Sequence, residues 1–316
     1  MIIELGIMLA SMIFLAISSD KAVDYAIKIS KYLGITGLSA GFIILSVSTS
    51  LPELFVSIHS SLVKEIGLSL GNVLGSNIAN VTIILGLAFF ISGRRFIKFN
   101  KRVFQGLLSF LFVASIIPLF ILQTGDLSFL MGVILIILFI FFAVKTPKKI
   151  EGIQDMEKAK KSEKAITVIK FIISLIIVLF SSKLLVDNSI IVATILGIPS
   201  SIIGATIIGF GTSLPELSTT IQAFKKKLYD VGIGNIIGSC ITNLTLILGV
   251  SSLLSTVPIN ILSFSTLIFF SILSMIITWY FVSTDRKIDR KEAAILIGIY
   301  AVFLLQELGI ITFLFK

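Results

Sequence analysis

The chain has 316 residues, of which 56% are hydrophobic and 14% charged, and its mean hydropathy is +1.09. A soluble domain of this length does not need so much apolar sequence. The apolar runs are unbroken and do not alternate with polar residues, which argues against a transmembrane β-barrel. Runs such as 103–122 and 127–144 are close to the roughly 20 residues that cross a bilayer as a helix. We therefore expect an all-α polytopic membrane protein, embedded in the lipid of the cell membrane.

The formal net charge is +9, from 26 Lys and Arg and 17 Asp and Glu. The basic residues lie in short loops between apolar runs, so we expect no nucleic-acid partner, and no segment implies a protein partner. The single cysteine, Cys240, excludes an intrachain disulfide. The first apolar run, 2–18, contains Glu4 and no preceding basic residues, so it is interpreted as a retained helix and not as a cleaved signal.

Hydropathy predicts ten transmembrane helices. In chain order they cover residues 2–31, 38–64, 66–92, 103–122, 127–144, 166–195, 199–226, 229–254, 261–282 and 291–315. Most Lys and Arg residues follow the first, third, fifth, seventh and ninth of these helices, and such an excess is typical of cytoplasmic loops. This alternation predicts that both termini lie outside.

The polar segment 145–165 is expected to be a cytoplasmic linker loop between two five-helix halves, residues 1–144 and 166–316. Residues 41–87 align without gaps to 204–250 at a constant offset of 163, and 20 of the 47 aligned positions are identical. Because five is an odd number of spans, the second half must enter the membrane the opposite way round. The sequence thus predicts two inverted repeats, an architecture of secondary transporters whose sites lie near the midplane where the repeats meet.

The aligned segments STSLPEL (48–54) and GTSLPEL (211–217) each place a glutamate inside an apolar helix. A charged side chain there costs roughly 2.5–3.5 kcal/mol, yet Glu53 and Glu216 occur at the same place in both repeats. The structural alternative is a buried glutamate with a fixed partner, but neither helix offers a basic residue nearby. We interpret both glutamates as functional.

Each glutamate follows a proline, Pro52 or Pro215. Proline cannot donate a backbone hydrogen bond and clashes with the carbonyl group four residues earlier, here that of Ser48 or Gly211, and a carbonyl oxygen freed in this way can coordinate a cation. Hydroxyl groups precede each glutamate by three and four residues, a spacing that puts them on one helix face. They belong to Thr49 and Ser50 in the first repeat and to Thr212 and Ser213 in the second.

A second pair of matching segments, GNVLGSNIAN (71–80) and GNIIGSCITN (234–243), adds polar residues four apart on one face. They are Asn72, Ser76 and Asn80 in the first segment and Asn235, Ser239 and Asn243 in the second. The glycines between them allow close helix approach. The alternative is that these side chains only join helices by hydrogen bonds, and it is strongest for Asn72 and Asn235.

These faces together offer only oxygen ligands: two carboxylates, hydroxyl groups, amide oxygens and loosened carbonyl groups. Hard cations prefer such ligands, and Ca²⁺ takes six to eight of them. The single His59 and the single Cys240 do not suffice for zinc or copper, and His59 is interpreted as a packing or interface residue. The chain offers no nucleophile–base pair or metal-ligand cluster, so we predict neither an enzyme nor a bound cofactor.

The two segments resemble the α-repeats of the sodium/calcium exchanger family, especially of its compact prokaryotic members. The motifs TSLPE and GNxxGS occur in both halves, and the resemblance covers the whole chain in span number, orientation and duplication. It implies one Ca²⁺ site flanked by Na⁺ sites. The implied calcium ligands are Glu53, Glu216, Thr49 and Thr212, and the implied sodium-site groups are Ser50, Ser76, Ser213 and Ser239 with the carbonyl groups of Ser46 and Gly209.

One departure from the family pattern concerns Asn80 and Asn243, which complete the candidate metal site. Many family members have an aspartate in one of these two places, whereas both are asparagine here. The site therefore has two obvious carboxylates and not three, which leaves the sodium stoichiometry and the choice between Na⁺ and H⁺ open. The proton-coupled branch shows an acidic residue in a GNxxE context, where this chain has Gly75 and Gly238.

We therefore predict a secondary active antiporter that exchanges Ca²⁺ for Na⁺ by alternating access, with a Ca²⁺/H⁺ antiporter as the main alternative and a cation channel as a weaker one. Ca²⁺ neutralises the two carboxylates and so can two Na⁺, and protons are expected to compete with both. The first and sixth helices are expected to slide against the other eight. Small residues line that gap and two acidic residues lie near the membrane surface: Ser18, Ser19, Ser181 and Ser182, and Asp24 and Asp187.

Overall fold

The structure is a computed structural model that describes residues 2–32, 45–98, 101–124, 128–145, 161–225, 227–255, 261–284 and 287–311. Its helices are α1 (Ile2–Tyr32), α3 (Leu51–Leu62), α4 (Ile66–Ala79), α5 (Leu85–Ile91), α6 (Lys101–Thr124), α7 (Phe129–Lys145), α8 (Lys161–Leu196), α9 (Ser200–Ile203), α10 (Gly209–Thr212), α11 (Leu214–Lys225), α12 (Tyr229–Thr242), α13 (Leu248–Leu254), α14 (Ile261–Thr284) and α15 (Arg290–Glu307). Residues 45–49 are also helical.

Three π-helical turns join these helices into longer stretches. They are η1 (Asn80–Ile84), η2 (Gly204–Ile208) and η3 (Asn243–Ile247). The first connects α4 to α5 and the third connects α12 to α13, so each predicted helix here is continuous but locally wider than an α-helix. Such single-turn π-bulges occur often at functional sites, and η1 and η3 begin at the matching residues Asn80 and Asn243.

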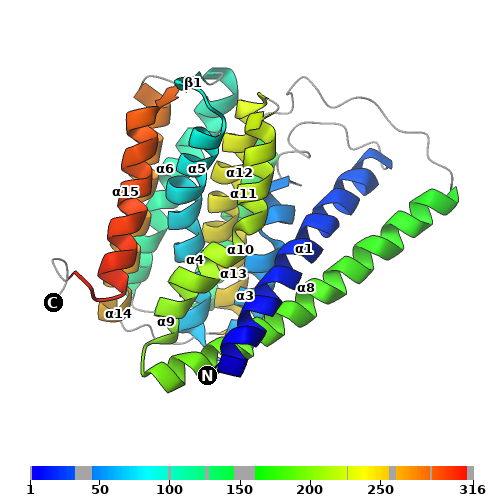
Figure 1. Cartoon of the computed structure of the whole chain (residues 1–316), viewed down its shortest axis with the longest axis vertical. Helices are drawn as coiled ribbons and strands as arrows, with labels where there is room; N and C mark the ends of the chain where they lie inside the picture. Colours follow the sequence, from blue (N-terminus) through cyan, green and yellow to red (C-terminus); the bar gives the residue numbers. More distant parts are fainter. Residues whose placement is uncertain are drawn as a thin grey trace.

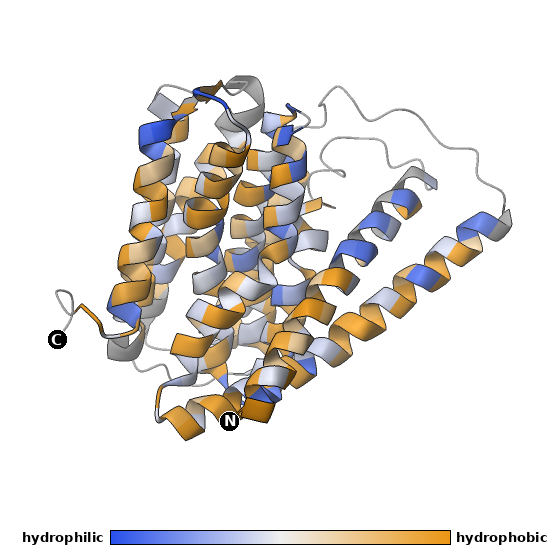
Figure 2. Cartoon of the chain, in the orientation of Figure 1, coloured by the Kyte–Doolittle hydropathy of each residue, from blue (hydrophilic) through white to orange (hydrophobic). Residues whose placement is uncertain are grey.

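The helices form a bundle whose centre is made by α4–α5 and α12–α13 (Figure 1). Of the apolar windows in these two stretches, 78% and 83% of the residues are buried, whereas only 28% are buried in α1 and in α8. By length and composition, five helical stretches in the described part of the chain can cross a membrane. Figure 2 shows hydrophobic residues along most of the outer helices, which suits contact with lipid.

Helices α1 and α8 lie side by side as a long, tilted pair at one edge of the bundle (Figure 1). They pack more extensively against each other than against the remaining helices, which they reach through α3, α9, α10 and α11. The four serines predicted to lie in this region are buried: Ser18, Ser19, Ser181 and Ser182. The outer face of α8 exposes apolar side chains such as Ile172, Ile176 and Phe180.

Glycine residues allow the backbone of α4 to contact the backbone of the second half of the chain. A Cβ atom added to Gly75 would collide with the backbone of Ala205, and one added to Gly209 would lie 2.9 Å from the backbone nitrogen of Ser76. The close approach predicted for the glycines of 71–80 is thereby confirmed at Gly75, and Gly209 is a further contact that was not predicted. This close approach brings the GNxxGS segment of the first half against the residues that precede TSLPE in the second.

Several features differ from the expectation. Helix α8 begins at Lys161, inside the predicted linker 145–165, because a helix can continue past the apolar residues that hydropathy detects. Much of the remaining linker lies outside the described residues. Two short strands, β1 (Phe96–Lys98) and β2 (Lys287–Asp289), pair antiparallel in basic segments that were expected to be loops.

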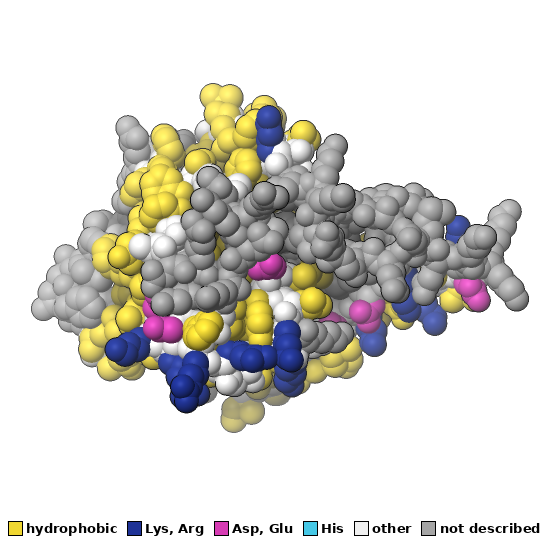
Figure 3. Space-filling model, turned by 90° about the horizontal axis from the view of Figure 1, so that it is seen from above, with side chains coloured by type: hydrophobic (Ala, Val, Ile, Leu, Met, Phe, Trp, Pro, Cys, Tyr) yellow, Lys and Arg dark blue, Asp and Glu magenta, His cyan; other side chains and the backbone are white. Residues whose placement is uncertain are grey.

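The end of the bundle at which β1 lies carries basic residues. Figure 3 views the molecule from this end and shows Lys and Arg side chains gathered along one side of it. At the same end, Nε of Arg94 donates a hydrogen bond to the hydroxyl oxygen of Tyr229 over 3.0 Å. This contact joins the segment before β1 to the start of α12.

Candidate cation-binding site

Both TSLPE segments interrupt a helix immediately before the glutamate. Ser50 and Ser213 have ψ angles of 11° and 8°, outside the helical range, and α3 and α11 begin at the next residue. The prolines therefore occupy the first turn of a new helix, where their missing N–H group costs nothing. Glu53 and Glu216 lie in the same first turns, and the positive end of a helix dipole stabilises a carboxylate there.

Each glutamate accepts a hydrogen bond from a serine of the other half. Ser213 Oγ donates to Oε1 of Glu53 over 3.0 Å, and Ser50 Oγ donates to Oε1 of Glu216 over 3.2 Å. Ser239 Oγ donates to the same oxygen of Glu216 over 3.1 Å. All of these side chains are buried. The two TSLPE segments, 163 residues apart, are thus interlocked around the two carboxylates.

The threonines that precede the glutamates make a second symmetric set of contacts. Thr49 Oγ1 donates to Oδ1 of Asn235 over 3.2 Å, and Thr212 Oγ1 donates to Oδ1 of Asn72 over 3.1 Å. Thr49 also lies 3.2 Å from Ser239 Oγ. Each threonine therefore joins its own helix break to the GNxxGS segment of the other half.

The two predicted carbonyl ligands lie within this network. The carbonyl oxygen of Gly209 accepts a hydrogen bond from Ser76 Oγ at 3.0 Å and lies 2.9 Å from Ser213 Oγ. The carbonyl oxygen of Ser46 accepts a hydrogen bond from the backbone nitrogen of Ser50 at 3.1 Å and lies 3.2 Å from Thr49 Oγ1. Both carbonyl groups are next to the hydroxyl groups expected to share a cation with them.

Several buried side-chain oxygen atoms of the predicted site residues have no hydrogen-bond partner among the described residues. They are Oε2 of Glu53, Oε2 of Glu216, and Oδ1 of Asn80 and of Asn243; the amide nitrogens of Asn80 and Asn235 also have none. Asn243 is oriented by its other atom, since Nδ2 donates to Oδ1 of Asn77 over 2.9 Å. A buried acceptor without a partner is costly, so these four oxygens point to a ligand that accepts oxygen lone pairs.

Asn72 and Asn235 belong to the same network, although the sequence left their role undecided. Asn72 Nδ2 donates to the backbone oxygen of Glu53 over 3.1 Å and to Ser57 Oγ over 3.0 Å. Its amide therefore supports the helix turn that carries Glu53. The signal in the sequence was its place four residues before Ser76, on the face that contains the site.

Cys240 and Asn77 occupy matching positions and meet between the two halves. Asn77 Nδ2 donates to the backbone oxygen of Cys240 over 3.4 Å, and Cys240 Sγ lies 3.9 Å from the backbone oxygen of Asn77. The thiol is buried and makes this packing contact, as expected for a cysteine without a ligand role.

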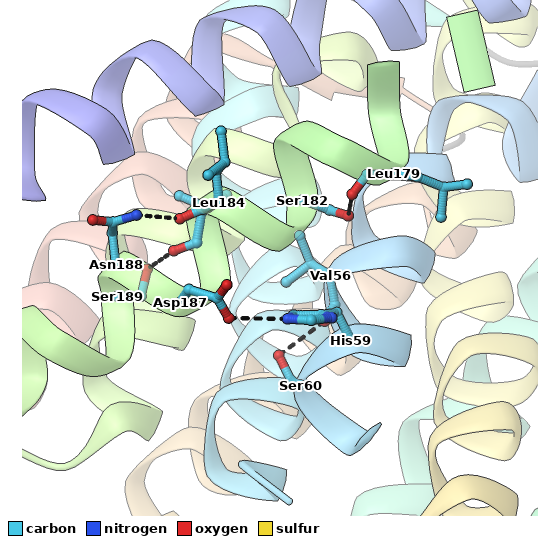
Figure 4. A network of polar contacts seen from close by, with 10 residues as sticks. Val56, His59, Ser60, Leu179, Ser182, Leu184, Asp187, Asn188 and Ser189 are labelled. Carbon is cyan, nitrogen blue, oxygen red and sulfur yellow. Dashed lines mark hydrogen bonds and ion pairs between the residues drawn. The ribbon is translucent and has the colours of Figure 1, made fainter. Parts of the chain in front are cut away.

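His59 lies away from the carboxylates, as its spacing from Glu53 predicted. Its Nε2 atom lies 3.0 Å from Oδ1 of Asp187 on α8 (Figure 4), which confirms it as an interface residue. Asp24 lies just beyond the apolar span Ile2–Ala22, as expected. Asp187, in contrast, lies inside the apolar span Glu163–Leu196, because its helix continues for nine residues beyond it.

Comparison with known proteins identifies a matching family and several similar proteins. A family model described as sodium/calcium exchanger protein matches residues 3–146 and 166–308. The sodium/calcium exchanger MaX1 of Methanosarcina acetivorans is 31% identical over 94% of this chain and 96% of its own length. The inner membrane protein YrbG of Escherichia coli is 30% identical over 88% of this chain and 90% of its own length.

Solved structures show the same fold. A structure of the sodium–calcium exchanger NCX_Mj, soaked with Na⁺, matches with a TM-score of 0.63 and 29% identity over 95% of this chain and 97% of that one. The crystal structure of the H⁺/Ca²⁺ exchanger CAX matches with a TM-score of 0.79 and 17% identity over 97% of this chain and 87% of that one. The chain therefore belongs to the family of sodium/calcium exchanger proteins, and it is a multi-pass membrane transporter and not an enzyme.

Proposed function

We propose that the chain is a secondary active antiporter that exchanges Ca²⁺ for Na⁺ across the cell membrane by alternating access. The observation that carries this proposal is the set of four buried oxygens without partners, on Glu53, Glu216, Asn80 and Asn243. Two of them belong to carboxylates, and the described residues give neither carboxylate a basic partner. A cation is the group that fits such a site.

The charge of the site favours a divalent ion or two monovalent ions. Unit charges of the same sign about 4 Å apart repel by about 4 kcal/mol at an effective dielectric constant near 20. Two ionised carboxylates in one buried site are therefore unstable when no cation is bound. One Ca²⁺ neutralises Glu53 and Glu216, and two Na⁺ do the same, so the two ions compete for the same oxygens. This competition couples their transport.

The donors around the carboxylates suit a hard cation. Ca²⁺ takes six to eight oxygen ligands, and the two glutamates with Thr49, Thr212 and the amide oxygens supply a set of that size. Na⁺ is proposed to use the hydroxyl groups next to the glutamates together with two backbone oxygens. These are Ser50, Ser76, Ser213 and Ser239, and the carbonyl groups of Ser46 and Gly209.

The proposed architecture is ten transmembrane helices in two inverted repeats, residues 1–144 and 166–316, with both termini outside. It is supported by the single family model that matches each half once. It is also supported by matching elements at the same offset: α3 and α11 both begin one residue before a proline, and η1 and η3 both begin at an asparagine.

Alternating access is proposed to arise from sliding of the α1–α8 pair against the remaining helices. The pair packs more extensively against itself than against the bundle. Apolar side chains such as Leu15 and Leu185 join it to Val56 on α3 in one cluster, and such non-directional contacts can be replaced by others when helices slide. The carboxylates lie on α3 and α11, which do not move in this scheme.

H⁺ is the alternative coupling ion, because carboxylates that bind Na⁺ can also bind protons. The positions at which an acidic residue marks the proton-coupled branch are Gly75 and Gly238 here, so we favour Na⁺. The test uses purified protein in vesicles loaded with Na⁺, K⁺ or acid buffer and diluted into ⁴⁵Ca²⁺. We expect uptake only with internal Na⁺. Uptake driven by the proton gradient alone would assign the coupling to H⁺, and uptake without any counter-ion gradient would indicate a channel.

A further inference from the structure

The contact between His59 and Asp187 joins the two parts that are proposed to move against each other. His59 lies on α3, six residues beyond Glu53, and Asp187 lies on α8, and the distance between Nε2 and Oδ1 is 3.0 Å (Figure 4). The side chains are 21% and 41% exposed. Ionisable side chains within a membrane segment are costly and are usually paired or functional. The antiport mechanism described above does not use either of them.

This contact lies near one end of the bundle. Helix α3 ends at Leu62, three residues after His59. At the same end, Ser200 Oγ donates to Oε2 of Glu65 over 2.9 Å, so the turn between α3 and α4 touches the start of α9. The contact therefore holds α8 against α3 close to one end of the bundle.

The repeat gives this contact a counterpart. At the offset of 163, His59 corresponds to Gln222 on α11, and Asp187 corresponds to Asp24 on α1. These two residues do not meet here: both are exposed, and Gln222 Nε2 donates to Ser218 Oγ over 3.3 Å. Gln222 lies three residues before the end of α11, near the end of the bundle at which Tyr229 and β1 lie.

We propose that the His59–Asp187 contact is a latch that holds the transporter in one of its two access states, and that a contact between Asp24 and Gln222 replaces it in the opposite state. The proposal rests on the proposed alternating access. In transporters built from inverted repeats, one part moves against the other around a fixed site. Because the repeats match at the offset of 163, the mirrored displacement of the α1–α8 pair would bring Asp24 to Gln222 and separate His59 from Asp187. In this structure the His59–Asp187 contact is formed and the Asp24–Gln222 contact is not, and the two pairs lie at opposite ends of the bundle. This is the arrangement expected of one access state.

The test measures the ratio of the two states in protein reconstituted into vesicles. Spin labels are attached at Leu62→Cys on α3 and Ile195→Cys on α8, two exposed positions, and their distance distribution is recorded; the natural Cys240 is buried. Asp187→Asn and His59→Gln are expected to lower the ratio of latched to unlatched protein about fivefold or more, the effect of losing one contact of ordinary strength. Lys170→Gln, an exposed change elsewhere on α8, is the matched control and is expected to leave the ratio unchanged.

Two further variants test the symmetry of the device. Asp24→Asn and Gln222→Ala are expected to change the ratio in the opposite direction, because they weaken the other state. Exchanging the partners, with His59→Asp and Asp187→His in one chain, is expected to restore the original ratio. A ratio that none of these substitutions moves would overturn the latch. A ratio that Asp24→Asn and Asp187→Asn shift in the same direction would also overturn it.

Different experiments test the latch and the proposed antiport function. The latch variants keep the carboxylates, so they are expected to bind Ca²⁺ within about twofold of the unmodified protein, measured by titration in detergent; much weaker binding would assign His59 and Asp187 to the site and overturn the latch. Absence of Na⁺-driven ⁴⁵Ca²⁺ uptake by the unmodified protein would overturn the proposed function alone.

Discussion

Ser213 donates a hydrogen bond to Glu53 over 3.0 Å, and the matching residue of the other half, Ser50, donates to Glu216 over 3.2 Å. Each half of the chain therefore orients the carboxylate of the other half. Neither TSLPE segment can build the site alone, and a shift of one segment moves a ligand of the other. The geometry of each carboxylate therefore depends on both repeats.

Removing either serine hydroxyl group is expected to weaken ion binding. Ser50→Ala and Ser213→Ala each delete a hydrogen bond to a buried carboxylate, and a bond to a charged group contributes about 1.5–3 kcal/mol. We expect the Na⁺ concentration that gives half-maximal exchange to rise about tenfold or more in both variants. Ser115→Ala is the control, since Ser115 Oγ donates only to its own helix, at the oxygen of Phe112. Ser213→Ala is expected to have the larger effect, because Oε1 of Glu216 keeps the hydrogen bond from Ser239 when Ser50 is replaced. An unchanged Na⁺ concentration in both variants would contradict the prediction.

Calcium uptake is expected to fall as the pH is lowered from about 8 to about 5. A proton bound to Glu53 or Glu216 removes the negative charge that holds the cation, so acid opposes binding and raising the pH restores it. Because proton and calcium compete, a higher Ca²⁺ concentration is expected to recover uptake at acid pH. The measurement is ⁴⁵Ca²⁺ uptake into Na⁺-loaded vesicles at several pH values, and a flat profile would show that protons do not compete at the carboxylates.

Fixing α8 to α3 is expected to stop exchange and spare ion binding. The variant His59→Cys with Asp187→Cys places two thiols on the facing helices, and a short bifunctional thiol reagent then joins them. Exchange is measured before and after the reaction, so that the protein without the cross-link serves as its own control. Ca²⁺ binding in detergent is expected to stay unchanged. Undiminished exchange after complete cross-linking would exclude sliding of α8 as the transport motion.

Gly75→Ala is expected to lower stability because its Cβ atom meets backbone, which cannot rotate away. The neighbouring atoms belong to Ala205 in η2, and overpacking of this kind costs typically 1–3 kcal/mol. We expect a clear drop in the midpoint of thermal unfolding in detergent. Gly298→Ala on α15 is the control, because a Cβ atom there has no neighbour within 4 Å among the described residues. Equal midpoints would mean that α4 and η2 are less tightly packed than the structure indicates.

The helices were predictable from hydropathy because apolar runs of membrane length are themselves the physical requirement for spanning lipid. The start of α8 at Lys161 was not, since polar residues that extend a helix beyond the membrane give no hydropathy signal. The π-helical turns at Asn80 and Asn243 were also missed, because one additional residue in a turn leaves the apolar pattern almost unchanged. The strands β1 and β2 pair residues about 190 positions apart, such as Ile97 with Ile288, and no local pattern predicts such a pairing.

The polar residues of the candidate site were predictable because the repeat shows each of them twice. Thr49 and Thr212 were expected near the carboxylates, and the contacts with Asn235 and Asn72 lie in that network. The partner of His59 could not be found in this way. Asp187 is 128 residues distant, and the pair is not repeated in the other half: Asp24 matches Asp187, but Gln222 stands opposite His59 in the alignment.

The most direct test of the central claim is Ca²⁺ transport by the variant in which Glu53→Gln and Glu216→Gln are combined. Removing one member of a buried charge interaction costs roughly 3–5 kcal/mol, so each single change is expected to weaken Ca²⁺ binding at least about 100-fold. The double variant is expected to show no Na⁺-driven ⁴⁵Ca²⁺ uptake, while Glu163→Gln, an exposed acidic residue in the first turn of α8, keeps full uptake. Normal uptake by a correctly folded double variant would contradict the claim that these two carboxylates hold the transported ion.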